Sequence, residues 1–190
     1  MHFVLASASP RRRELVELMG LSPLKILPAV GEEVAEPGLT GGALAETLAL
    51  HKAREVARQC DADDIVIGAD TIVCLDGAVF GKPHDEADAA RMLRALSGRA
   101  HTVYTGVAVI RGSETRTHAE ATDVHFRTLT DAEIAGYIAT GEPMDKAGAY
   151  GIQGRGSLLI TGIDGDFFNV MGLPVCALGE ILKSFGVDLL

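Results

Sequence analysis

The sequence predicts an α/β protein that folds as a single domain over residues 1–190. A chain of 190 residues is long enough to bury a substantial core without disulfides. Its composition, 47% hydrophobic and 23% charged with 22 glycines, is typical of a globular α/β protein and too apolar for a disordered one. The chain also carries both kinds of pattern, an amphipathic helical one at residues 43–58 and a β-branched run at residues 65–75.

Strand and helix signals alternate along the first half of the chain. We expect, in order, a strand at residues 3–6, a helix from Ser9 to about Met19, a strand at 24–29, a helix at 43–58, a strand at 65–75 and a short strand at 79–80. Ser9 supplies an N-cap and Pro10 a first-turn proline, which together define the start of the first helix. The run at 65–75 is rich in β-branched residues and indicates a buried central strand.

The second half begins with clear patterns and then becomes rich in loops. We expect a helix at residues 85–96, strands at 101–110 and 117–127 joined as a hairpin through residues 111–113, a helix at 130–138 and a closing helix at 178–185. Thr130 and Glu133 have the spacing of a capping box. Between Gly141 and Gly172 glycine recurs without a fixed period, which predicts loops.

Charge and cysteine content exclude several classes of protein. A formal net charge of −9 disfavours binding to nucleic acid or to an anionic membrane, so an anionic ligand must be held locally. No apolar stretch approaches the roughly 20 residues that span a bilayer, and the first positive charges follow the first apolar run, unlike a signal peptide. The 3 cysteines form no CxxC pair, which favours a reducing compartment and therefore the cytoplasm.

Asp70 and Thr71 stand at the end of the apolar run that starts at Ile65. A charge beyond an apolar strand is costly unless it is used or paired. Ligands of open α/β sheets lie off the carboxyl ends of the strands, so Asp70 is a candidate catalytic residue. The alternative is that Asp70 only caps a neighbouring turn.

Three arginines, Arg11, Arg12 and Arg13, fall in the first turn of the helix that begins at Ser9. A helix N-terminus carries a partial positive charge, so basic residues there cost stability. Their position is explained if free N–H groups, the Ser9 hydroxyl and the guanidinium groups bind a phosphate. The alternative is a solvated basic face.

Scattered lysines and a glycine-rich segment are weaker candidates. Lys52, Lys82 and Lys146 each lie beside small or turn residues, and each alone is typical of a solvated surface charge. The segment from Lys146 to Gly156 lets the backbone approach a ligand, and Gln153 offers a donor and an acceptor suited to a base edge. The same segment is also compatible with a surface loop.

Metal and hydrolase motifs are few. Glu32 and Glu33 form a carboxylate pair of the kind that binds Mg²⁺ or Mn²⁺, although adjacent surface acids often have no such role. The chain has no HExxH, GxSxG or Walker A motif, so zinc hydrolysis, serine hydrolysis and P-loop chemistry lack support.

These segments together resemble the Maf family, also called septum formation inhibitor proteins, which are nucleotide pyrophosphatases. The resemblance rests on blocks that follow one another along nearly the whole chain: LASASPRRREL at 5–15, IVIGADTIV at 65–73, GKP at 81–83, LSGRAHTVYTGV at 96–107, EPMDKAGAYGIQG at 142–154 and GDFFNVMGLP at 165–174. It implies a mixed sheet with flanking helices and two lobes around a deep cleft, similar to inosine triphosphate pyrophosphatase. It also implies a homodimer.

The resemblance assigns roles to individual residues. The family's catalytic aspartate falls on Asp70, which is also expected to bind the metal together with Glu33. Family members that hydrolyse dTTP and UTP carry three specificity residues that are matched here by Arg12, Thr71 and Gln153. The branch that prefers 7-methyl-GTP has acidic residues in place of the last two. Phosphate-binding positions are matched by Ser9, Arg13, Lys52 and Lys82.

The expected activity is therefore hydrolysis of dTTP or UTP, or of modified pyrimidine nucleotides, to a monophosphate and diphosphate, with Mg²⁺ or Mn²⁺ and with Asp70 as the proton acceptor. Two alternatives remain open. A nucleotide-binding regulator of septation would use the same cleft without turnover. A nucleic-acid-binding regulator would need a large basic face, whereas the sequence offers only basic clusters.

Overall fold

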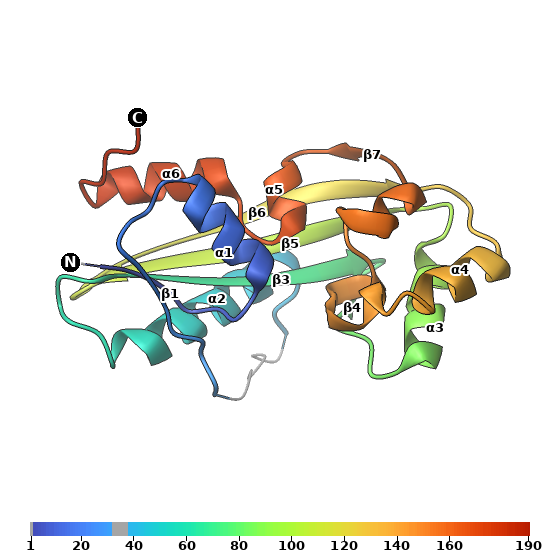
Figure 1. Ribbon diagram of the computed structural model, residues 1–190, viewed down its shortest axis with the longest axis horizontal. Helices are drawn as coiled ribbons and strands as arrows, with labels where there is room; N and C mark the ends of the chain where they lie inside the picture. The colour runs from blue at the N-terminus through green and yellow to red at the C-terminus, as the bar shows by residue number, and fades with distance from the viewer. Residues whose placement is uncertain (1, 32–37) are drawn as a thin grey trace.

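The computed structural model describes residues 2–31 and 38–190, and within them seven strands form one mixed sheet (Figure 1). In chain order the strands are β1 (Phe3–Leu5), β2 (Leu24–Ile26), β3 (Ile65–Leu75), β4 (Ala78–Phe80), β5 (Ala100–Arg111), β6 (Glu114–Phe126) and β7 (Ile160–Asp164). Their spatial order is β2-β1-β3-β5-β6-β7, with β4 paired to β3. β1 runs parallel to β2 and β3, whereas β5 runs antiparallel to β3 and β6. The predicted mixed sheet and hairpin are confirmed.

Helices cover both faces of this sheet. They are α1 (Pro10–Leu18), α2 (Gly41–Ala57), α3 (Glu86–Leu96), α4 (Asp131–Ile138), α5 (Phe167–Met171) and α6 (Val175–Ser184), with 3-10 turns η1 (Glu142–Asp145), η2 (Ala147–Ala149) and η3 (Gly154–Leu159). Figure 1 shows α1, α5 and α6 on one side of the long strands and α3 and α4 at the far end from α6. No helix in the described part of the chain is long and apolar enough to cross a membrane.

The hydrophobic core opposite α2 is divided along the strands. Ile67 of β3 packs with Leu15 of α1 and Leu178 of α6 in one cluster. Val73 of β3 packs with Leu93 of α3 and Ile134 of α4 in another. Alternate residues of a strand share a face, so Thr71, between residues 67 and 73, lies on this face at the junction of the two clusters. The clusters are the cores of two lobes that share the long strands.

α2 packs closely on the opposite face because two strand positions there are glycine. A Cβ added to Gly106 of β5 would lie 2.2 Å from the backbone of Ala45, and one added to Gly68 of β3 would lie 2.4 Å from the carbonyl oxygen of Ala49. Both distances are far shorter than any van der Waals contact. Glycine therefore lets α2 approach the sheet and brings Lys52 over Asp70.

Local signals predicted most boundaries, and the differences have physical reasons. The Ser9 N-cap and the capping box of Thr130 and Glu133 are confirmed. The second strand ends at Ile26 rather than residue 29, and the closing helix starts at Val175 rather than residue 178. The glycine-rich last third was predicted to be loop, but it also holds β7 and α5, which are too short for a periodic signal.

Candidate active site

β3 has the bounds of the predicted strand at residues 65–75, so that prediction is confirmed, and Asp70 lies in its middle. The expectation that Asp70 stands beyond the end of a strand was wrong, because β3 continues past Asp70 by pairing with β5 on one side and with β4 from Val73 onward. The pairing of β1 with β3 ends at Ile67. Among the described residues, β3 has no strand partner on this edge between Ile67 and Val73. The carboxyl end of β1 lies beside this stretch of β3. Ligands of open α/β sheets lie off the carboxyl ends of the strands, so it is β1, not β3, whose end marks the candidate site.

Asp70 forms an ion pair with Lys52 of α2. The Nζ atom of Lys52 donates a short hydrogen bond to Oδ1 of Asp70, and the two side chains are 19% and 10% exposed. Two charges this buried are costly unless each is well paired. No described residue donates to Oδ2 of Asp70. Lys52 therefore fixes the carboxylate while leaving its second oxygen for a ligand.

On the face of the sheet opposite α2, Arg12 forms hydrogen bonds with three segments of the chain. Its Nε donates to the carbonyl of Gly172 at 2.8 Å, its Nη1 to the hydroxyl of Ser7 at 3.2 Å and its Nη2 to the hydroxyl of Thr71 at 3.0 Å. Ser9 caps α1, and its hydroxyl accepts from the backbone N–H of Arg12 at 3.5 Å. The loop after β1, the centre of β3 and the turn after α5 thus meet at Arg12.

The three consecutive arginines do not act as one cluster. Neighbouring residues on a helix differ by about 100° in direction. Arg12 turns toward Thr71, whereas Arg13 is 61% exposed and its Nε donates to Glu17 at 2.8 Å. Arg11 pairs with Asp145 of η1 at 3.5 Å. No described contact brings Arg13 to Asp70, so its phosphate-binding role stays a prediction.

The glycine-rich segment bridges the two cores. Tyr150 is buried in the cluster beside α3 and α4, while Ile152 packs against the cluster beside α1 and α6. The exposed Gln153 follows directly and precedes η3. Among the described residues no printed contact joins Gln153 to Arg12 or Thr71, so its part in a base site stays a prediction.

A half-buried carboxylate, that of Glu142, shapes the same segment. Glu142 accepts hydrogen bonds from the backbone N–H groups of Gly156 and Arg155, each at 3.0 Å, and from the Tyr137 hydroxyl at 2.9 Å. Burial alone would raise the pKa of Glu142, but these hydrogen bonds lower it. Nearby, Lys146 donates to the carbonyl of Glu142 at 2.7 Å. The loop is therefore held in a defined shape without a ligand.

Lys82 stands on an exposed loop beside the glycine-rich segment. The backbone N–H of Gly148 donates to the carbonyl of Gly81 at 3.0 Å, which joins the GKP loop to η2. The Lys82 side chain is exposed. The structure thus places Lys82 beside η2, and its phosphate-binding role stays a prediction.

The predicted metal ligands are only partly described. Glu33 lies outside the described residues. Within residues 2–31 and 38–190, no group of three or more His, Cys, Asp or Glu side chains is arranged to hold a metal ion. Asp70 is the one predicted metal ligand whose surroundings the structure describes.

Sequence reasoning missed a buried polar network next to Thr71. Thr105 of β5 and Asn169 of α5 are each 0% exposed, and Thr122 of β6 is 1% exposed. The Thr105 hydroxyl lies 2.9 Å from that of Thr71, and Asn169 Nδ2 donates to the Thr122 hydroxyl at 2.9 Å. The available signal was the presence of polar residues inside apolar runs, because a buried polar group needs a partner.

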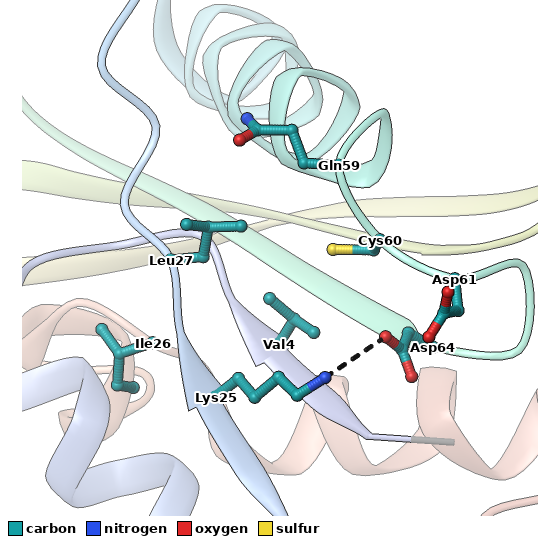
Figure 2. A pocket seen from close by; sticks show the side chains of 8 residues that line it. All are labelled: Val4, Lys25, Ile26, Leu27, Gln59, Cys60, Asp61 and Asp64. Atoms are coloured by element: carbon teal, nitrogen blue, oxygen red, sulfur yellow. Dashed lines mark ion pairs between the residues drawn. The ribbon is translucent and has the colours of Figure 1, made fainter.

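A separate pocket of about 440 Å³ lies between β1, β2 and the end of α2 (Figure 2). None of the predicted site residues lines it. Lys25 and Asp64 face each other across it at 4.0 Å. Asp64 also accepts from the backbone N–H of His2 at 2.7 Å; burial alone would raise the pKa of Asp64, but the His2 hydrogen bonds lower it. Asp64 thus holds the N-terminal segment in place by hydrogen bonds to His2. None of the residues proposed above for catalysis or ligand binding lines the pocket.

Comparison with known proteins shows which family this chain is similar to. The model of the Maf-like protein family matches residues 2–185. A dTTP/UTP pyrophosphatase of Moorella thermoacetica is 58% identical over 188 residues, covering 97% of this chain and 95% of the relative. Proteins of the same name from Pelotomaculum thermopropionicum and Bacillus cereus strain ZK / E33L are 49% and 48% identical, covering 98% and 97% of this chain and 98% and 96% of their own length.

Among solved structures, a nucleoside-triphosphatase, or dITP/XTP pyrophosphatase, of Mycobacterium abscessus aligns over 97% of both chains with 17% identity and a TM-score of 0.48. The family match covers nearly the whole chain and includes every described residue of the site at the lobe junction. The chain belongs to the Maf family.

Proposed function

We propose that this chain is a nucleoside triphosphate pyrophosphatase that hydrolyses dTTP and UTP, including modified pyrimidine nucleotides, to the monophosphate and diphosphate. The observation that carries the proposal is the meeting of two side-chain pairs at the lobe junction. Asp70 with Lys52 offers a fixed carboxylate, and Thr71 with Arg12 offers fixed polar groups on the adjacent residue of the same strand. A relative that is 58% identical to this chain is named for that activity.

Asp70 acts as the proton acceptor. Water attacks the α-phosphorus, a new P–O bond forms there as the bridging P–O bond to the β-phosphate breaks, diphosphate leaves, and the proton of the water passes to Asp70. The Lys52 hydrogen bond to Oδ1 supports this role because it fixes the carboxylate, while no described residue donates to Oδ2. A base held in one orientation by a second group is typical of enzymes.

The substrate's phosphates carry several negative charges into a protein whose net charge is −9. Cations must therefore be concentrated at the site. We assign the phosphate contacts to Ser9, Arg13, Lys52 and Lys82. Lys52 has the strongest support, because it is already held beside Asp70. Its charge offsets the charge that develops during cleavage.

A divalent cation, Mg²⁺ or Mn²⁺, fits the residues that are described. Mg²⁺ usually keeps several waters and is held by one or two carboxylates together with substrate phosphates. Asp70, with one hard oxygen that no described residue occupies, meets this requirement, and Glu33 is the second proposed ligand. When bound, such a cation acidifies water and neutralises phosphate charge.

Arg12, Thr71 and Gln153 are proposed to read the base. The Nη2 atom of Arg12 donates to the Thr71 hydroxyl at 3.0 Å. The exposed Gln153 follows Ile152, which packs against the core cluster beside α1 and α6. Replacing Gln153 with Glu introduces a charge and removes a donor. We expect this variant to lose efficiency on dTTP and UTP.

We also propose that the protein is cytoplasmic and forms a homodimer. Light scattering of the purified chain tests the dimer.

The reaction and substrate class are tested together by one assay. The purified chain is incubated with canonical and modified triphosphates in Mg²⁺ or Mn²⁺, and diphosphate and orthophosphate are measured separately. We expect diphosphate from UTP and dTTP. Release of orthophosphate would place cleavage at another bond, and tight nucleotide binding without product would favour a regulator of septation.

A further inference from the structure

β6 has an open edge over more than half of its length. β7 pairs with residues 123–126 of β6, at the end toward α3 and α4 (Figure 1). Over residues 114–122 no described strand pairs with β6 on that side, although β5 pairs with residues 114–125 on the other. An unpaired strand edge presents main-chain donors and acceptors to solvent and is a template for another strand.

The direction of the main-chain groups on this edge follows from the hydrogen bonds at the end of β6. The N–H of Phe126 donates to the carbonyl of the residue that precedes β5 at 3.0 Å, whereas the carbonyl of His125 accepts from a side chain of β7 at 3.1 Å. Successive residues of a strand alternate in this direction, and the β5–β6 register is unshifted from residue 114 to residue 125. Thr117 and Ala119, an even number of residues from His125, therefore direct their N–H and C=O groups out of the open edge.

The side chains of the same stretch lie on the two faces of the sheet. The Thr117 hydroxyl donates to a carboxylate of α2, so the odd-numbered side chains face α2. The guanidinium group of Arg116 lies 5.8 Å from the centre of the aromatic ring that follows α6, and the His118 Nε2 atom lies 3.2 Å from Oε2 of Glu120. Arg116, His118 and Glu120 therefore form a row of polar side chains on the face that carries α6.

A second copy of this chain fits the open edge in an antiparallel register. The commonest symmetry of a homodimer is a two-fold axis, which sets the same stretch of both chains side by side in opposite directions. Outward-facing residues must then pair with outward-facing residues. With the axis at His118, Thr117 lies opposite Ala119 of the partner subunit, and both such pairs exchange main-chain hydrogen bonds in each direction.

Charge favours the axis at His118. Arg116 then lies opposite Glu120 of the partner subunit, and the symmetry repeats this pair. Opposite residues of this class lie about 4.5 Å apart at Cα and have the closest side chains. An axis at Thr117 would instead set Glu114 opposite Glu120 of the partner subunit, and like charges directly opposite each other are destabilising.

The surroundings of β6 disfavour a shift in the other direction. An axis at Ala119 would need Ala121 for the pairs next to the axis. The Ala121 carbonyl oxygen faces Gly165, where an added Cβ would lie 3.1 Å from it. The shift would also remove the pairs between unlike charges. The register about His118 combines open main-chain groups with matched charges.

We propose that two copies of this chain associate through the open edges of β6, about a two-fold axis at His118, so that their sheets join into one. This inference rests on the homodimer proposed above and names its interface. Every contact in such an interface occurs twice, so a single substitution changes two symmetry-related contacts. Association also covers a strand edge that would otherwise be open to other chains.

The first test reverses the charges across the interface. Sedimentation of the purified chain at low salt measures the Kd of the dimer. We expect Arg116→Glu and Glu120→Arg each to raise this Kd by about tenfold or more, because each sets like charges opposite each other in both pairs. The double variant exchanges the charges and should restore the Kd to within about threefold. No recovery in the double variant would overturn the proposed register.

The second test acts on the main chain. Ala119→Pro removes an N–H group that points out of the edge, so the hydrogen bonds between β5 and β6 remain. We expect this variant to sediment as a monomer at concentrations where the unmodified protein is a dimer. Urea denaturation establishes that the variant is folded. A folded Ala119→Pro protein that still forms the dimer would overturn the inference.

A matched control makes the same change of charge elsewhere. Arg58 is exposed at the end of α2, and Arg58→Glu should leave the Kd of the dimer unchanged. Sedimentation and the diphosphate assay separate this inference from the proposed activity. A chain that is monomeric at every concentration overturns the interface even if it hydrolyses UTP. A dimer that responds to these variants but releases no diphosphate supports the interface and refutes the proposed activity.

Discussion

Asp70 and Thr71 are consecutive residues of β3, so their side chains point to opposite faces of the sheet. Asp70 meets Lys52 on the α2 face, and Thr71 meets Arg12 on the face that carries α1. Both residues pair with β5, and on the opposite edge, the β1 side of β3, no described strand pairs with them. The groups proposed for proton transfer and for base recognition therefore lie on opposite faces of the same strand.

Some residue assignments follow from the sequence and others need the fold. Asp70 was identifiable because a charge in an apolar run demands a use. The contact of Thr105 with Thr71 was not, because it depends on their register, which only the pairing of β3 with β5 reveals. The different roles of Arg12 and Arg13 also depend on the orientation of α1.

His101 is a buried residue that should control stability in mild acid. Its ring packs edge-on against Phe126 and Tyr150, and its Nε2 lies 2.7 Å from the Tyr150 hydroxyl. Burial lowers the pKa of His101 from 6.5 to about 4. Below pH 6.5 the unfolded chain binds a proton that the folded chain refuses, so stability falls as the pH decreases toward 4.

This loss is measurable by urea denaturation between pH 7 and pH 5. The His101 contribution amounts to about 2 kcal/mol of unfolding free energy over that range, since one unit of pKa shift corresponds to about 1.4 kcal/mol. His101→Gln should show a correspondingly smaller decrease. The same pH dependence in the variant and the unmodified protein would contradict the assignment.

At the scale of elements, the packing of α2 on β3 and β5 positions Lys52. Gly106→Ala would force a Cβ to within 2.2 Å of the Ala45 backbone, so α2 must move. We expect unfolding free energy to fall by about 1–3 kcal/mol, as for overpacked cores, and catalytic efficiency to fall with it. Chemical denaturation and the diphosphate assay measure the two effects.

Gly136 of α4 provides a control of opposite sign. It is exposed, its φ is not positive, and a Cβ added there meets nothing within 4 Å. Gly136→Ala should therefore stabilise the protein by about 0.4–1 kcal/mol and leave activity unchanged. Equal effects of the two substitutions would show that close approach of α2 is not what Gly106 provides.

The sequence predicted elements that carry their own local signals. The α2 periodicity, the β5–β6 hairpin and the Thr130 cap all depend on residues near one another in the chain. β7 depends on pairing with the distant β6, and the pairing contains an irregularity at His125 and Phe126. α5 has only five residues and gains its stability from packing on β5 and β6.

At the scale of the whole molecule, two cores share the long strands, and the proposed ligand lies at their junction. A ligand that binds only the folded state stabilises it by about 2.7 kcal/mol at a concentration of 100 Kd. For a domain of this size that corresponds to a rise in Tm of roughly 5–10 °C. We expect this rise with a non-hydrolysable UTP analogue, measured by calorimetry.

The same analogue should have little effect on a variant that lacks the base contacts, such as Thr71→Val at the same concentration. An equal rise in Tm for the variant and the unmodified protein would place the nucleotide elsewhere. The charge of −9 and the absence of a nucleic-acid motif were readable from composition. The junction was not, since it forms between residues far apart in the chain.

Asp70→Asn tests whether Asp70 accepts the proton of the attacking water. The amide keeps the size of the side chain but cannot serve as the base. We predict that kcat for diphosphate release from UTP falls by at least about 100-fold while nucleotide binding and the fold are retained. Asp123→Asn, on the exposed surface of β6, should turn over normally. Near-normal kcat in a folded Asp70→Asn protein would contradict the account.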